Sequence, residues 1–418
     1  MHLHALIIPG ALAGVIVSTT CAQGADAAPV SSSAFRWSTS TVIEETYDSN
    51  VYLQSTTPLA DRSSWVTSVG AVFDVSTKPG AERTTSLAYA PTWTVFHSER
   101  AEDFLAHRFS ASTQMPLSGG KLSTQASALV IDGPEEGITW TGVGGAPAVG
   151  GPSVRDRRDQ AVYRASVRSE WTAGHLVIRP VGTLYWGDFR SAHLTTPGYQ
   201  NCADRGDLSL GSDVLTSLAP RLQTGLGLRV GGQDQARLLG YPEEYDNRYV
   251  RVLALLEGPL SRWCSTSISI GPEFRHYGEH VHATFGDRSV TNLFVDASMT
   301  FTAGKSDTIA LLVRQFQQMS SSGRGAFDDR NFDIAWRHAF SKHATGALVL
   351  HAYNTEFLPP AVRDDWVYTA RAQCSLTLTE TLSVDGSVLF EEGASDIPAM
   401  PGREYTRQAF SLGLRARF

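Results

Sequence analysis

Arginine is the residue type whose spacing in this sequence could most clearly do chemistry. Ten arginines occupy alternate positions in segments whose other positions are apolar: Arg164, Arg168, Arg179, Arg229, Arg275, Arg337, Arg371, Arg407, Arg415 and Arg417. Six acidic residues share the polar positions: Asp74, Glu170, Glu273, Asp296, Asp333 and Asp385. A row of permanently charged guanidinium groups attracts anions. The alternative is that these arginines pair with the carboxylates and stiffen a wall, and the sequence leaves both interpretations open.

Histidines are the second group with chemical potential. His276, His280 and His282 lie closest together, and imidazoles at such a spacing can bind a divalent metal. They lie at the edge of a predicted loop, and no G-x-S-x-G nucleophile motif lies beside them. A surface cluster without function is the simpler interpretation. We therefore predict no catalytic residue, no metal site and no cofactor, and we do not expect an enzyme.

The elements that must position the arginines are β-strands, because apolar and polar residues alternate with period two. The clearest segment ends the chain, with Phe410 and Leu412 on one face and Arg407 and Arg415 on the other. Each alternating segment is at or above the roughly 9 to 11 residues that a tilted strand needs to cross a hydrocarbon layer. The segments are 34–46, 63–76, 82–97, 103–115, 121–132, 158–171, 175–190, 206–217, 222–233, 246–257, 264–276, 289–302, 306–318, 329–340, 343–355, 365–378, 382–392 and 404–418. The registers of 103–115, 246–257 and 306–318 are ambiguous, because both of their faces are apolar.

The connections between these segments alternate in length. Residues 173–174 and 341–342 are short links, whereas 47–62 and 133–157 are long ones. Short turns at one end and long loops at the other are typical of outer-membrane barrels. The prediction is an all-β fold: a single transmembrane antiparallel β-barrel of about 18 strands, with 16 as the alternative, short periplasmic turns and long extracellular loops. Loop 133–157 is expected either to cover the surface or to fold into the lumen.

The beginning of the chain and its composition set further limits. Residues 1–28 have the pattern of a signal peptide, with an uncharged stretch from Ala5 to Thr20 followed by small residues, so we assign 29–418 to the barrel. No later stretch is long and apolar enough for a membrane-spanning helix. The chain has 35 basic and 42 acidic residues, a net charge of -7, which gives no attraction to nucleic acid.

Two short segments resemble known families. The final residues resemble the C-terminal signal by which Gram-negative outer-membrane barrels are recognised for assembly, through Ser411, Gly413, Ala416 and Phe418. Residues 45–52, ETYDSNVY, are similar to a Tyr-Asp-x-Asn-Val-aromatic element near the start of a family of β-barrel porins that often accompany exopolysaccharide synthesis and export. These resemblances imply the cell outer membrane as the location. They also imply outer-membrane lipid, lipopolysaccharide, the barrel-assembly machinery and polysaccharide-export components as partners.

Aromatic residues near strand ends are expected to form girdles at the membrane interfaces. They are Trp65, Trp93, Trp140, Trp171, Trp186, Trp263, Trp336, Trp366, Tyr163, Tyr185, Tyr368 and Tyr405, with Tyr185 the main candidate for the lumen. The function that follows is an outer-membrane channel whose arginine-lined lumen favours anionic solutes, either as a porin or as a component of exopolysaccharide export. The alternatives are a closed structural or adhesive surface barrel and an outer-membrane enzyme that uses loop histidines.

Overall fold

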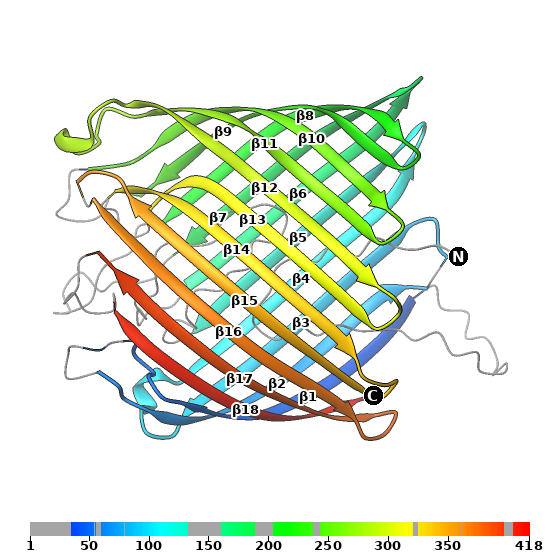
Figure 1. Ribbon diagram of the computed structural model, residues 1–418, viewed down its shortest axis with the longest axis vertical. Helices are drawn as coiled ribbons and strands as arrows, with labels where there is room; N and C mark the ends of the chain where they lie inside the picture. Colours follow the sequence, from blue (N-terminus) through cyan, green and yellow to red (C-terminus); the bar gives the residue numbers. More distant parts are fainter. Residues whose placement is uncertain are drawn as a thin grey trace.

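The computed structural model describes residues 35–53, 55, 60–78, 80–132, 160–188, 204–236, 243–320, 325–360, 362–396 and 404–418. The predicted signal peptide and loop 133–157 lie outside them. The described residues form eighteen strands and two short 3-10 turns (Figure 1). The strands are β1 Phe35–Asp48, β2 Ser64–Thr77, β3 Thr84–Phe96, β4 Phe104–Leu117, β5 Gly120–Asp132, β6 Gln160–Ala173, β7 Leu176–Asp188, β8 Arg205–Ala219, β9 Leu222–Gln235, β10 Asn247–Ser261, β11 Cys264–Tyr277, β12 Ser289–Ala303, β13 Asp307–Met319, β14 Ala326–Ala339, β15 Ala344–Phe357, β16 Arg363–Thr377, β17 Leu382–Ser395 and β18 Tyr405–Arg417. Each lies within about four residues of a segment predicted from alternation alone, which confirms the all-β prediction.

The strands close into one barrel. Every strand pairs antiparallel with its neighbours in sequence, and β1 also pairs with β18, from Ser40 opposite Arg417 to Asp48 opposite Ala409. Closure leaves no sheet edge with unpaired backbone groups, which is the condition for a sheet to cross a lipid bilayer. The prediction of a single antiparallel barrel with about 18 strands is confirmed.

The two ends of the barrel differ, as the connection lengths predict. Both ends of the described chain lie at the same end of the barrel, together with the short turns (Figure 1). Gly119 and Gly174 sit in these turns with φ of 78° and 62°, a conformation that glycine adopts without strain. We call this the short-turn end and the opposite one the long-loop end.

The outer face carries large exposed apolar side chains around the whole circumference, with Trp37, Leu226 and Leu412 each more than 60% exposed. In water such a surface would be unfavourable, whereas lipid solvates it. A strand of 14 residues is about 47 Å long at roughly 3.4 Å per residue, and a tilt of about 40° leaves a height near 36 Å. That height exceeds the apolar band of about 25 Å that outer-membrane barrels present. None of the described helical turns is long and apolar enough to span a membrane.

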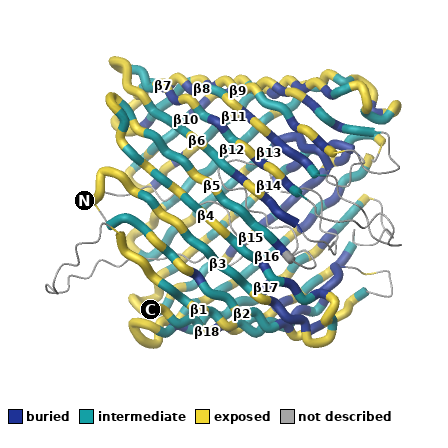
Figure 2. The backbone as a smooth tube through the Cα atoms, turned by 180° about the vertical axis from the view of Figure 1, so that it is seen from behind, coloured by how far each residue is buried: buried dark blue, intermediate teal, exposed yellow. Residues whose placement is uncertain are grey.

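The inner face explains one of the three strands whose register was ambiguous. In β10, Val250 and Val252 are exposed on the outside, while Leu253 and Leu255 are buried on the inside against Leu215 of β8. Both faces are therefore apolar, because part of the lumen is packed with hydrophobic side chains. Buried residues gather at the long-loop end, away from the termini (Figure 2).

Candidate functional site: the lumen

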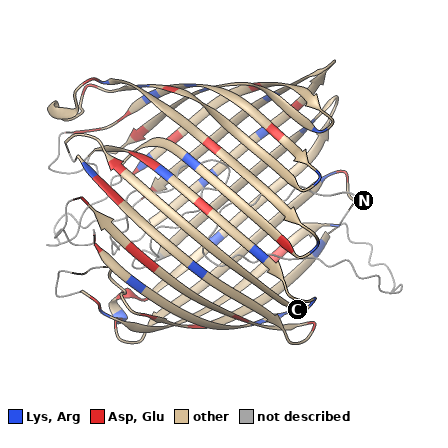
Figure 3. Cartoon of the chain, in the orientation of Figure 1, with Lys and Arg blue, Asp and Glu red and all other residues tan. Residues whose placement is uncertain are grey.

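The register places the ten predicted arginines on the face opposite the exposed apolar side chains. Arg229, for example, lies between Leu228 and Val230, which are 50% and 54% exposed on the outer face. The six predicted acidic residues share the inner face by the same alternation of register. Figure 3 shows basic and acidic residues mixed along the strands, with neither sign gathered on one part of the barrel.

Five of these arginines form ion pairs: Arg179, Arg229, Arg275, Arg407 and Arg415. The Nε atom of Arg179 donates to Asp213 Oδ2 at 2.8 Å, and its Nη1 atom donates to Glu257 Oε2 at 2.6 Å. Buried guanidinium groups need such partners, because an uncompensated charge in a low-dielectric site is costly. For these five residues the geometry corresponds to the wall-stiffening interpretation.

The other five, Arg164, Arg168, Arg337, Arg371 and Arg417, form no ion pair within the part of the chain that the structure describes. Their charge is not cancelled by direct contact with a carboxylate. These are the arginines that can attract an anion in the lumen.

Several charged residues of the inner face were absent from the sequence-based set. The acidic ones include Asp48, Asp207, Asp213, Glu257, Asp329 and Glu391, and the basic ones include Arg205 and Arg251. Arg205 was placed in a predicted loop, and Arg251 lies in a strand of ambiguous register. With these additions the named residues are twelve basic and twelve acidic, so the excess of positive charge that ten arginines against six acidic residues indicated disappears.

Strand β13 separates from β12 at the long-loop end, whereas β14 stays paired with β15 as far as Phe327 opposite Phe357. The β12–β13 ladder stops where Val295 faces Gln315, whereas the β13–β14 ladder continues to Met319 opposite Ala326. Residues Phe316 to Met319 are all buried, without the alternation of a wall strand. We call Phe316–Ser320 and the facing residues Gly325–Phe327 the hairpin tip. Its sequence signal is the run Gln317–Gln318, which interrupts the alternating pattern.

Side chains of β8, β9 and β11 hold the hairpin tip. Arg205 Nη1 of β8 donates to the Met319 carbonyl oxygen at 2.6 Å, and Gln235 Nε2 of β9 donates to that of Ser320 at 2.6 Å. Arg275 Nη2 of β11 donates to the Gln317 carbonyl oxygen at 2.9 Å. Since β8 and β13 are five strands apart, about 24 Å along the wall, these contacts must cross the interior. The hairpin tip therefore lies inside the lumen.

The loop before β10 packs beneath the hairpin tip. Tyr245 joins Tyr277, Phe285, Met319 and Ala326 in one buried cluster. Burial raises the pKa of Tyr245 to about 12, because a phenolate would be poorly solvated there. The Tyr245 hydroxyl is thus neutral, and the cluster adds apolar packing to the polar contacts that hold the tip.

The element that resembles the β-barrel porin family joins the first loop to β18. Asp48 accepts hydrogen bonds from Arg407 at 3.0 and 2.8 Å, and Asn50 Nδ2 donates to the Thr406 carbonyl oxygen at 3.0 Å. Val51 and Tyr52 follow in a buried cluster with residues of β2 to β5. These contacts close the barrel at the long-loop end, so this element has a structural role.

The predicted assembly signal forms the last residues of β18. Ser411 faces the lumen and shares a hydrogen bond with Ser387 at 2.7 Å, and Gly413 faces the same side opposite Glu44. Ala416 points outward, and Phe418 is 74% exposed while its N–H donates to the Thr39 carbonyl oxygen at 2.8 Å. Recognition of these residues by the assembly machinery stays a prediction.

The three histidines of the predicted cluster each have a local partner. His276 Nδ1 lies 3.0 Å from Ser289 Oγ, His280 lies 3.7 Å from Glu244, and His282 accepts from the N–H of Thr284. In the described ranges, no group of three or more His, Cys, Asp or Glu side chains could hold a metal ion.

The aromatic residues divide between the two faces. Eight of them are exposed on the outside: Trp65, Trp93, Trp171, Trp186, Trp263, Trp336, Tyr163 and Tyr368. The Trp366 ring stacks on that of Tyr368, and Trp140 lies outside the described residues. Tyr185 lies in the lumen and is 2% exposed. Assigning Tyr405 to a girdle was wrong: it is buried on the inner face and donates to Glu391 at 3.2 Å, because Glu391 and Arg407 provide polar surroundings there.

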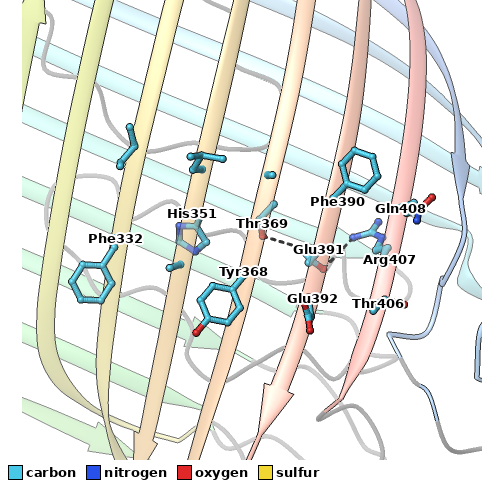
Figure 4. Close-up of a pocket in the computed structure, with 14 residues that line it drawn as sticks. Phe332, His351, Tyr368, Thr369, Phe390, Glu391, Glu392, Thr406, Arg407 and Gln408 are labelled. Atoms are coloured by element: carbon cyan, nitrogen blue, oxygen red, sulfur yellow. Dashed lines mark hydrogen bonds and ion pairs between the residues drawn. The ribbon is translucent and has the colours of Figure 1, made fainter.

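A shallow groove crosses β14 to β18 (Figure 4). Its lining includes Phe332, Tyr368 and Phe390, which are exposed on the lipid-facing side, while Glu391 and Arg407 belong to the inner face. The groove therefore opens mainly on apolar outer surface and is not the entrance of a solute path.

Comparison with known proteins agrees with this architecture. Residues 282–418 match the family described as "Putative beta-barrel porin 2". The chain is a Gram-negative outer-membrane β-barrel. Its location in the outer membrane follows from this match together with the closed barrel and its apolar outer face. The short-turn end is then the periplasmic end, and the long-loop end is extracellular.

Solved structures with a similar fold include outer-membrane proteins of pseudomonads. The Pseudomonas aeruginosa protein OpdK has 11% identity and a TM-score of 0.44, covering 92% of this chain and 99% of that one. OccK2 (OpdF) of the same organism has 10% identity and a TM-score of 0.47, covering 91% and 98%. A BenF-like porin from Pseudomonas fluorescens Pf-5 has 10% identity and a TM-score of 0.45, and the alignment covers 91% of this chain and 99% of that one. With TM-scores under 0.5, these similarities do not indicate a function for this chain. No curated protein matches the sequence.

Proposed function

We propose that this barrel is a passive outer-membrane channel that favours small anionic solutes. The observation that carries the proposal is the set of inner-face arginines that contact no carboxylate of the described residues at ion-pair distance, of which Arg168 and Arg371 lie on different parts of the wall. Paired arginines such as Arg179 stiffen the wall, whereas unpaired ones leave positive potential for a passing solute.

The expected size of the effect follows from Coulomb's law. A unit charge about 8 Å from the solute in water contributes about 0.5 kcal/mol, and screening at 0.1 M salt reduces this to about 0.2 kcal/mol. Since an anion is attracted while a cation is repelled by the same amount, each unpaired arginine changes the anion-to-cation permeability ratio by about twofold. Two arginines change the ratio by about fourfold to fivefold.

Planar-bilayer recording of the folded barrel tests the proposal. In a KCl gradient, the reversal potential should have the sign for chloride preference, and R168Q combined with R371Q should reduce the permeability ratio about fourfold. The control is R168K combined with R371K, which keeps both charges and should leave the ratio within about twofold. Cation preference of the unchanged chain would contradict the proposal, and absence of current would favour a closed structural or adhesive barrel.

Export of exopolysaccharide is a second candidate. It is supported by the resemblance of residues 45–52 to an element of β-barrel porins that accompany export systems, although Asp48 and Asn50 of that element also close the barrel. Deleting the gene and measuring secreted polysaccharide separates the two candidates. Loss of secreted polysaccharide with unchanged uptake of small anions would favour export and a partnership with export components.

A further inference from the structure

Two arginines flank one buried tyrosine in the lumen. Arg164 of β6 lies opposite Tyr185 of β7, and its guanidinium carbon is 5.5 Å from the ring centroid. Arg205 comes from β8, on the other side of β7, with its guanidinium carbon 5.3 Å from the same centroid. The three residues are 8%, 2% and 3% exposed. Two like charges are thus held near one ring in a buried place.

Polar atoms of this group lack partners. Neither the Nε atom of Arg164 nor the hydroxyl of Tyr185 has a hydrogen-bond partner, and Arg164 forms no ion pair within the described ranges. The carboxylate nearest in register is Asp207, opposite Tyr185, but it accepts hydrogen bonds from Gln233 at 2.7 Å and from Tyr249 at 2.8 Å. It is therefore committed to β9 and β10.

Arg164 differs from two other deeply buried arginines of the wall. Arg179 and Arg275 are each 2% exposed, and both contact a carboxylate within 3 Å. A buried guanidinium without such a contact has unfulfilled hydrogen-bonding capacity and uncompensated charge. An external anion would accept the missing hydrogen bonds and compensate the charge.

We propose that Arg164, Tyr185 and Arg205 form a binding site for the carboxylate group of a small organic acid. The planar guanidinium fork of Arg164 donates to the two carboxylate oxygens, the Tyr185 hydroxyl donates a further hydrogen bond, and Arg205 adds positive charge. The site rests on the proposed function and deepens it, because it names a substrate class and a place where the channel would hold it.

The position of the site relates it to the hairpin tip. Arg205 donates to the Met319 carbonyl oxygen of the tip at 2.6 Å, so a bound carboxylate shares Arg205 with the segment that crosses the lumen. A solute bound here lies beside the inserted hairpin, on the extracellular side of the barrel. The site therefore lies near the long-loop end, next to the segment that crosses the lumen.

The test measures carboxylate binding separately from conduction, using the full chain folded in detergent. Sodium acetate replaces sodium chloride at constant ionic strength, and the unfolding temperature is recorded. For the unchanged barrel we expect a saturable rise with acetate. R164Q should raise the acetate concentration of the half-maximal response at least tenfold, and R164K and Y185F should raise it less. The control is R337Q, which changes an inner-face arginine near the short-turn end that forms no ion pair with the described residues, and it should retain the response.

Two outcomes would overturn the site. The first is no saturable rise in the unchanged barrel, and the second is an equal loss of response in R337Q. A saturable response to sulfate but not to acetate would also exclude the carboxylate assignment.

Failure of the site and failure of the channel are distinguishable. If acetate does not bind but the bilayer current is anion-selective, the site is wrong and the proposed function stands. If acetate binds with the expected dependence on Arg164 but no current flows, the site stands and the barrel is a receptor for carboxylates without passage.

Discussion

Replacement of Arg275 by glutamine should weaken the attachment of the hairpin tip to the inner face of β11. Arg275 donates to Glu273, Gln233 and Asn247, and its Nη2 atom donates to the Gln317 carbonyl oxygen of the tip. Glu273 keeps its second partner, Arg251, at 2.5 Å, so the change leaves no buried carboxylate without a cation. The main loss for the tip is one charge-assisted hydrogen bond.

That hydrogen bond sets the magnitude. A hydrogen bond to a charged group contributes about 1.5 to 3 kcal/mol, and a loss of about 2 kcal/mol changes the ratio of undocked to docked tip about thirtyfold. The contacts of Arg205 with Met319 and of Gln235 with Ser320 remain, so the tip should undock transiently and not permanently. An undocked tip leaves a wider lumen.

Single-channel recording measures this ratio. We expect R275Q to spend about thirtyfold more time, relative to the main state, in a state of higher conductance. R229Q is the matched control, because Arg229 pairs with Asp213, Asp213 keeps Arg179, and Arg229 does not contact the tip. If R275Q and R229Q are both folded and give the same current distributions, the hairpin tip does not limit conduction and the reasoning is refuted.

Two further predictions concern closure and assembly. D48A should destabilise the barrel by about 1.5 to 3 kcal/mol, because Arg407 loses its charge-assisted hydrogen bonds to Asp48 but keeps Glu391 at 3.8 Å. Urea unfolding followed by tryptophan fluorescence measures this, and the control T41A, on the outer face of the same strand, should change stability by less than about 0.5 kcal/mol. Deletion of Phe418 should lower the amount of barrel in the outer membrane several-fold in cells but leave refolding in detergent intact, because this exposed residue contributes little packing; equal loss in both assays would show a structural role instead.

The sequence alone determined the strands and their faces. Alternation of apolar and polar residues has period two, the same period as side chains along a strand, so Leu228 and Arg229 had to lie on opposite faces. Lipid outside and water inside impose this contrast on nearly every strand, which is why the strand number and the type of fold could be predicted. The prediction was ambiguous where lumen packing makes both faces apolar, as at Leu253 and Leu255.

Only the tertiary structure decided which inner-face charges are neutralised. Arg179 pairs with Glu257, 78 residues away, and Arg205 contacts Met319, 114 residues away. Such contacts depend on the register of several ladders and on the departure of β13 from the wall after Gln315, which no local pattern specifies. Arginines that look equivalent in the sequence therefore divide into paired residues, which stiffen the wall, and residues such as Arg164, which form no ion pair with the described part of the chain.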